Sequence, residues 1–105
     1  MRGKEITLYR VEKGNNWYRL SARLVGRSLL MEGQDFTALA KGMYGDEEYE
    51  YFYSFDAENT KKLSKALGGG NLLKKLKAFY GGEIKNKEFA EFCGNNGVTY
   101  FRGSV

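Results

Sequence analysis

The chain has 105 residues, 42% of them hydrophobic, and a formal net charge of +4, which fits a single folded domain spanning residues 1–105. It contains no histidine, no proline and one cysteine, Cys93, so the sequence excludes Ser-His and Cys-His catalytic pairs, an intrachain disulfide and a cysteine-rich zinc site. We therefore predict a binding protein that is not an enzyme and needs no cofactor.

Alternation of polar and apolar residues predicts three strands in the N-terminal third, at residues 5–13, 17–25 and 29–31. In the first strand, strict alternation would place Leu8 and Tyr9 on opposite faces. The second strand follows a Gly-Asn-Asn turn, and the third follows a short turn at Gly26. Links this short join only antiparallel neighbours, so the strands should form a meander.

A fourth strand is predicted at residues 47–55, where aromatic residues recur at every second position. One face of this strand holds Tyr49, Tyr51, Tyr53 and Phe55, and the other holds Glu48, Glu50, Phe52 and Ser54. The segment before it, residues 33–46, contains three glycines and little periodicity, which predicts a loop with a helical turn at residues 37–41.

Three short helices are predicted after Asp56, because apolar residues then recur at helical spacing. The expected N-caps are Asp56, Asn71 and Asn86, and runs of glycine end the first two helices. Residues 98–102, rich in β-branched and aromatic side chains, predict a last strand. The order predicts an α+β fold: a mostly antiparallel sheet, made of a meander of about four strands plus a C-terminal strand, with two to three helices on one face.

Charge is segregated along the chain. Residues 32–58 carry eight acidic residues and one lysine, whereas residues 60–87 carry eight lysines and one glutamate. The acidic segment includes residues 46–53, where four carboxylates stand among three tyrosines. Carboxylates speed encounter with a positively charged partner and tyrosines supply rigid contact area, so this run is a candidate binding patch. The alternative is a strand with a solvated acidic face and an aromatic core face.

The lysines between residues 61 and 87 are a second candidate, because a basic surface attracts phosphates. Combined with Trp17, Arg19 and Arg23 of the second strand, they would support a nucleic-acid-binding regulator that stacks bases on the sheet. The alternative is that these lysines only cover the solvated faces of two amphipathic helices.

Catalysis by carboxylates alone is a further alternative, with Glu32, Asp35 and Asp46 near a glycine-containing segment. A domain of this size leaves little room for a sugar cleft, and no spacing marks a pair. Cys93 lies on the expected inner face of a helix, which favours a buried inert thiol. The glycines at residues 68–70 follow a helix and lack a Gly-Lys-Ser/Thr sequence, so they do not predict a phosphate-binding loop.

Most of the chain from residue 29 onward resembles a family of small bacterial proteins. The resemblance lies in a GQD turn at residues 33–35, a GD-x-EYE strand at residues 45–51, a leucine-rich helix pair from residue 56, and a short helix, Asn-Gly turn and aromatic strand at residues 92–101. Some members of this family resemble immunity proteins encoded beside toxins of contact-dependent growth inhibition, including partners of EndoU-type ribonucleases.

The resemblance implies an immunity protein that binds a cognate toxin nuclease domain and occludes its active site. In the acidic-aromatic run, we predict steering by Asp46, Glu47, Glu48 and Glu50 and anchoring by Tyr44, Tyr49 and Tyr51. No stretch approaches the ~20 apolar residues of a membrane span, and residues 1–12 lack an apolar signal segment. We therefore expect a cytoplasmic protein with no membrane partner.

Overall fold

The structure is a computed structural model that describes residues 4–38 and 46–104; the side chains of Ala38, Asp46 and Glu47 are not among the described atoms. The elements in chain order are β1 (Glu5–Lys13), β2 (Asn16–Val25), β3 (Ser28–Ala38), β4 (Asp46–Phe55), α1 (Ala57–Ala66), α2 (Leu72–Tyr80), α3 (Asn86–Asn95) and β5 (Phe101–Ser104). In the described part of the chain, the five strands form one antiparallel sheet in the order β1-β2-β3-β4-β5. The predicted α+β fold is confirmed.

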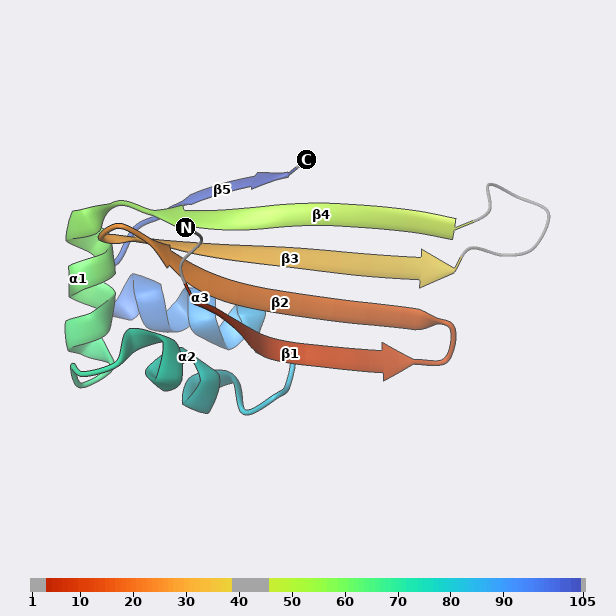
Figure 1. Cartoon of the computed structure of the whole chain (residues 1–105), viewed down its shortest axis with the longest axis horizontal. Helices are drawn as coiled ribbons and strands as arrows, with labels where there is room; N and C mark the ends of the chain where they lie inside the picture. The colour runs from red at the N-terminus through yellow and green to blue at the C-terminus, as the bar shows by residue number, and fades with distance from the viewer. Residues whose placement is uncertain (1–3, 39–45, 105) are drawn as a thin grey trace.

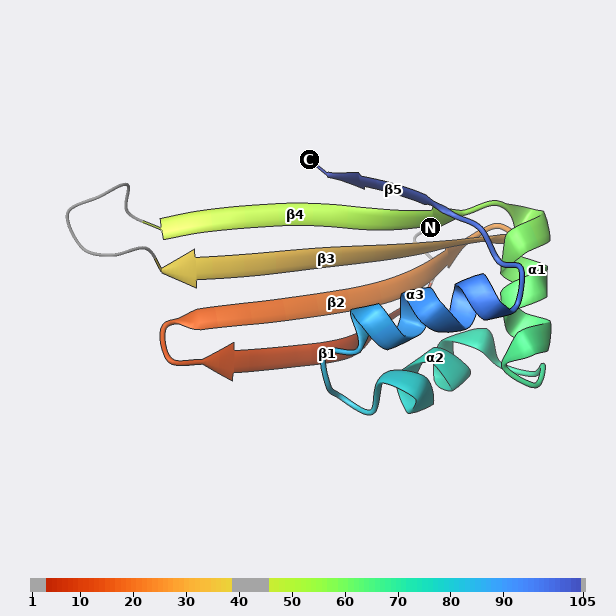
Figure 2. The same ribbon diagram turned by 180° about the vertical axis from the view of Figure 1, so that it is seen from behind.

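The helices cover only one face of the sheet. Figure 1 and Figure 2 show α2 and α3 side by side under this face, and α1 lies across the end where β3 begins and β4 ends. The far ends of β1 to β4 extend beyond the helices, and no helix of the described residues covers the opposite face (Figure 1). None of the helices in the described residues is long and apolar enough to cross a membrane.

A β-bulge in β1 corrects the prediction for Leu8 and Tyr9. The register against β2 shifts between Thr7 and Tyr9, so two consecutive residues turn toward the helices. Leu8 and Tyr9 are therefore both buried, at 1% and 2% exposure. Strict alternation fails here because the bulge inserts one extra residue into the strand.

The third strand is much longer than predicted, and the loop expected from Gly33 onward is wrong. Residues 33–38 continue β3; residues 33–36 pair with both β2 and β4, and Thr37 and Ala38 pair with β4. Thr37 and Ala38 are strand residues, so the predicted helical turn is wrong there, and residues 39–41 lie outside the described chain. Pairing on both sides outweighs the low strand propensity of glycine.

The N-caps predicted for the first two helices are confirmed. The Asp56 carboxylate accepts a hydrogen bond from the backbone N–H of Asn59 at 2.8 Å, and the Asn71 side chain accepts one from Lys74 at 3.1 Å. The cap predicted for α3 is wrong. Lys85 occupies that position without a side-chain bond, and the Asn86 side chain instead points to buried tyrosines.

Two buried polar residues of α1 join the helix to the sheet. The Thr60 hydroxyl accepts a hydrogen bond from the Leu29 backbone N–H at 3.0 Å. The Asn59 side-chain oxygen accepts one from the Thr99 backbone N–H at 2.9 Å. Because Thr99 bonds to α1, pairing with β4 begins only at Phe101, three residues later than the predicted start of the last strand at residue 98.

Candidate binding surface on the helix-free face of the sheet

Strand alternation separates the predicted acidic and aromatic binding residues. In β4, Glu48 and Glu50 lie on the helix-free face, whereas Tyr49 and Tyr51 lie on the face that carries the helices. The backbone of Asp46 and Glu47 is part of β4, but their side chains are not described. Tyr44 lies outside the described residues. The run therefore does not form one continuous patch of carboxylates and tyrosines.

Tyr51 is an interior residue with only 5% of its surface exposed. Its row across the sheet is Tyr9, Leu20, Gly33 and Tyr51, one residue from each of β1 to β4. The Tyr51 ring lies over Gly33, where a Cβ atom would overlap with it. From this position, the Tyr51 hydroxyl reaches the Tyr9 hydroxyl at 3.1 Å. Tyr51 therefore offers a partner little contact surface.

Asn86 completes the polar cluster around these tyrosines. Its side-chain nitrogen donates to the hydroxyls of Tyr9 at 2.9 Å and Tyr51 at 3.2 Å, and its oxygen accepts from the Tyr80 hydroxyl at 2.9 Å. Burial raises the pKa of each of these tyrosines, so all three phenols stay neutral. The cluster joins β1, β4, α2 and α3 and has a structural role.

An aromatic group lies on the helix-free face of β2 and β3. The Trp17 and Phe36 rings stack with centroids 5.7 Å apart, and the guanidinium of Arg10 lies 5.6 Å from the Trp17 ring centroid. Phe36 was missed because it fell in the predicted loop. Continuing the two-residue period through Gly33 would have placed Glu32, Gln34 and Phe36 on one face.

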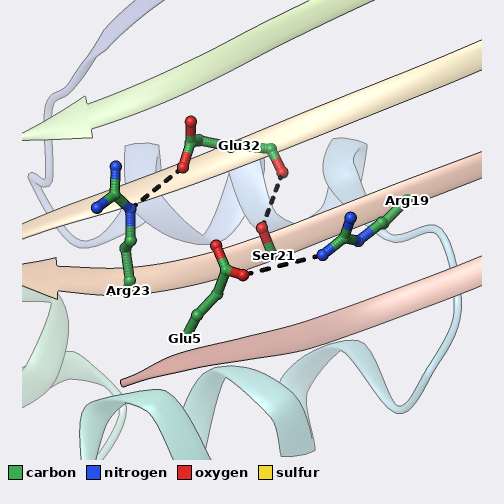
Figure 3. A network of polar contacts seen from close by, with 5 residues as sticks. All are labelled: Glu5, Arg19, Ser21, Arg23 and Glu32. Carbon is green, nitrogen blue, oxygen red and sulfur yellow. Dashed lines mark hydrogen bonds and ion pairs between the residues drawn. The ribbon is translucent and has the colours of Figure 1, made fainter. Parts of the chain in front are cut away.

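Charged residues occupy the centre of the same face. Figure 3 shows Glu5 of β1 facing Arg19 of β2, with 3.9 Å between carboxylate and guanidinium atoms. Arg23 of β2 contacts Glu32 of β3 at 3.2 Å, and the Ser21 hydroxyl donates to the Glu32 carbonyl at 3.5 Å (Figure 3). Of these residues, Glu5, Arg19, Ser21 and Glu32 border a shallow depression of about 280 Å³. Each of these arginines already has a carboxylate partner.

Glu48 and Glu50 of β4 make this face acidic. Glu48 accepts a hydrogen bond from the Gln34 side chain at 2.9 Å, and Glu50 forms no ion pair with any described residue. The described side chains of this face include five glutamates (Glu5, Glu12, Glu32, Glu48, Glu50) and three arginines (Arg10, Arg19, Arg23), a net charge of −2. This face therefore attracts a positively charged partner.

A second aromatic pair borders the carboxylates at the other edge. Phe52 of β4 and Phe101 of β5 lie with ring centroids 5.8 Å apart, and Phe101 is 64% exposed. Aromatic side chains are enriched at protein interfaces, so this pair can contribute to a contact with a partner. The sequence placed Phe101 in a strand but did not show which face it would occupy.

The helix lysines lie on the other side of the molecule. Exposed lysines of α1 and α2 are Lys61, Lys62, Lys65, Lys74, Lys75 and Lys77. Trp17, Arg19 and Arg23 lie on the helix-free face, so one segment of nucleic acid cannot contact both predicted sets. In addition, Arg19 and Arg23 are paired with carboxylates.

The residues considered for catalysis do not come together. Glu32 and Asp35 lie on opposite faces of β3, and the side chain of Asp46 is not described. Cys93 is fully buried, and this burial raises the pKa of its thiol to about 12, which keeps it protonated at neutral pH. Among the described residues, no group of histidine, cysteine, aspartate or glutamate side chains is placed to hold a metal ion.

Asp35 lies between Tyr18 and Tyr49 on the helix side of the sheet, and burial raises the pKa of its carboxyl. A raised pKa in the folded state means that the folded protein is less stable when the Asp35 carboxyl is ionised. That cost is absent below the unfolded pKa of about 3.9 and grows as the pH rises through the folded value. We therefore expect Asp35→Asn to raise the urea midpoint at pH 7, with the gain shrinking toward pH 3.5.

Asp56→Ala is a control for this measurement, because it should change the stability in the opposite direction to Asp35→Asn. Backbone and side-chain hydrogen bonds from Asn59 lower the pKa of the Asp56 carboxyl. Its stabilising effect is present above the unfolded pKa and is lost as the pH falls through the lowered value. Asp56→Ala should therefore destabilise the protein at pH 7 and lose most of this effect in acid. The same sign for both variants at pH 7 would contradict the assignment.

Comparison of the chain with protein-family models, with curated proteins and with solved structures found no match. The function is therefore inferred from the surface itself, namely its partly exposed aromatic pairs, its unbalanced carboxylates and the lysines on the opposite side.

Proposed function

We propose that this chain is a cytoplasmic immunity protein that binds a cognate toxin nuclease domain in a stoichiometric complex and occludes its active site. The observation that carries the proposal is the helix-free face of the sheet, which has a net charge of −2 among its described side chains and an aromatic pair on either side of its carboxylates. The proposed partner is the catalytic domain of a nuclease.

The charge of this face suits such a partner. A nuclease must hold a phosphate backbone, so the surface around its active site is positively charged. An acidic face is attracted to that surface, which raises the association rate, and it competes with the nucleic acid for the same cations. Phe101, which is exposed, and the half-buried Trp17, Phe36 and Phe52 then supply contact area in an interface of roughly 1,600 Å².

Glu48 and Glu50 are the steering residues in this proposal, with Asp46 and Glu47 at the start of the same strand. Tyr49 is 40% exposed on the other side of β4 and would contact a partner that reaches around the sheet edge. Phe101 and Trp17 join the proposed anchors, whereas Tyr51 supports the surface from the interior. Tyr44 stays a proposed anchor next to β4 in sequence.

Nucleic-acid binding by the helices is the second candidate. The observation in its favour is that the lysines of α1 and α2 form no ion pair with any described residue. Filter binding of RNA and DNA in rising salt tests this candidate. Retention with a steep salt dependence supports it, and weak binding at all salt concentrations removes it.

The immunity proposal predicts co-purification with the product of the adjacent upstream gene and rescue of cells that express that product. We expect Glu48→Lys combined with Glu50→Lys to reduce the association rate constant about tenfold or more at low salt, with a smaller reduction at high salt because counterions screen the charges. Stopped-flow mixing of the two proteins measures this effect.

Lys74→Glu combined with Lys75→Glu changes the same number of charges in the opposite direction on exposed positions of α2. Because these lysines lie away from the proposed interface, this control should leave the rate constant unchanged or raise it slightly. No complex with the upstream gene product, together with no rescue, would falsify the proposed function.

A further inference from the structure

Strand β4 is paired along its whole length on one side and only in part on the other. Its side facing β3 has ten residue pairs, from Asp46 to Phe55. Its side facing β5 has four, from Tyr51 to Ser54. Within the described chain, Asp46–Glu50 therefore pairs on one side only, and Figure 1 shows β5 beside only the part of β4 nearest α1.

The opposite edge of the sheet is protected. Strand β1 contains a bulge and packs against α2. A bulge and a covering helix are among the devices by which natural sheets prevent the addition of another strand. The exposed half of β4 shows no irregularity in its register with β3, and the chain contains no proline.

We infer that the exposed edge of β4 at residues 46–50 binds an extended basic segment of the partner as an added antiparallel strand in line with β5. This inference rests on the proposed function, because it states how the nuclease partner is recognised. Backbone hydrogen bonds at a sheet edge supply affinity, and alternate side chains supply specificity. The described part of β5 ends at Ser104, opposite Tyr51, so the added strand continues from there.

The negative charge of β4 favours a basic segment as the added strand. Glu48 and Glu50 share one face and are exposed, so cationic side chains at alternate positions of the added strand would lie opposite them. An apolar side chain between them would face Tyr49. A second copy of this chain, paired edge to edge through β4, would instead bring glutamates against glutamates, which is unfavourable.

A seven-residue peptide of alternating lysine and valine is the probe for this edge. We expect it to slow hydrogen exchange, measured by NMR, of the outward-facing amides of residues 47–50 by about tenfold, because these N–H groups gain carbonyl partners. A control peptide methylated at every backbone nitrogen keeps every side-chain charge but has no N–H to donate on either edge, so it should give no protection.

Charge reversal sharpens the test. Glu48→Lys combined with Glu50→Lys should lose the protection by the lysine peptide and gain it from an alternating glutamate and valine peptide. Glu88→Lys combined with Glu91→Lys, at exposed positions of α3, is the matched control and should respond like the unchanged chain. Equal protection by the methylated peptide, or protection that appears on β1 instead of β4, would overturn the inference.

The outcome for this edge is separable from that for the proposed function. If the upstream gene product binds and inhibition depends on Glu48 and Glu50, but the amides of residues 47–50 exchange as fast in the complex as in the free chain, the edge inference fails and the immunity function stands. If the lysine peptide protects these amides and the gene product does not bind, the edge is a basic-peptide site and the immunity function fails.

Discussion

Replacing Gly33 with alanine should lower the free energy of unfolding by about 1–3 kcal/mol, although the change adds a single methyl group. The Tyr51 ring lies across the position that the new Cβ atom would take. This ring cannot move aside freely, because its hydroxyl is hydrogen-bonded to Tyr9 and Asn86. The substitution therefore strains the packing or breaks the tyrosine cluster. Urea unfolding followed by tryptophan fluorescence measures the loss.

Two comparisons isolate the contact between Gly33 and Tyr51. Gly94→Ala is the matched glycine control, because Gly94 lies within α3 with no atom near its added Cβ, and alanine there should stabilise the helix by up to about 1 kcal/mol. In a Tyr51→Ala background, the cost of Gly33→Ala should largely disappear. An equal cost in both backgrounds would show that the ring does not cause it.

Removing the side chain of Asn86 should cost about 2–4 kcal/mol, because three hydrogen bonds to buried tyrosine hydroxyls are lost at once. Tyr80 is fully buried and Tyr9 is 2% exposed, so their hydroxyls have little access to replacement water. We expect Asn86→Ala to lower the urea midpoint by the corresponding amount without a change in the folding cooperativity.

Asn96→Ala provides the control for this measurement. Asn96 is the residue directly after α3. Its side chain makes one exposed hydrogen bond to the Phe92 carbonyl at 2.8 Å. Its removal should cost less than about 1 kcal/mol. Equal losses for Asn86→Ala and Asn96→Ala would mean that the tyrosine hydroxyls do not depend on Asn86.

The tyrosine cluster also bears on the proposed binding surface. It holds Tyr51 against the helix side of the sheet, and the adjacent residues Glu50 and Phe52 are thereby directed to the helix-free face. A partner then meets side chains on a rigid strand, so less conformational entropy is lost on binding. We regard the interior of this protein as the support that keeps its acidic face in place.

The sequence predicted part of the candidate site. The alternation of glutamate and tyrosine in residues 48–51 predicted two different faces, because a strand turns successive side chains to opposite sides. The sequence also favoured an aromatic core face, and Tyr51, Tyr53 and Phe55 are buried. It did not show which glutamates would remain without a cationic neighbour, since their neighbours come from other strands.

The failures have one common cause. Residues 33–38 lack clear local strand signals, and their strand conformation comes from pairing with β4 along the whole segment and with β2 as far as Phe36. Asn86 stands at a position typical of a helix cap, yet its side chain bonds to Tyr9 and Tyr51, 77 and 35 residues away in sequence. Local patterns do not contain such distant partners.

The sequence by itself therefore determined the element types, the caps of α1 and α2, and the segregation of acidic from basic residues, because these depend on residues close together in the chain. Only the tertiary structure decided that β3 extends past Gly33, that the Tyr51 ring crosses it to reach Tyr9, and that Glu48 and Glu50 lie on the helix-free face. Those features arise from pairing between strands, where burial and hydrogen bonding across the sheet outweigh local propensity.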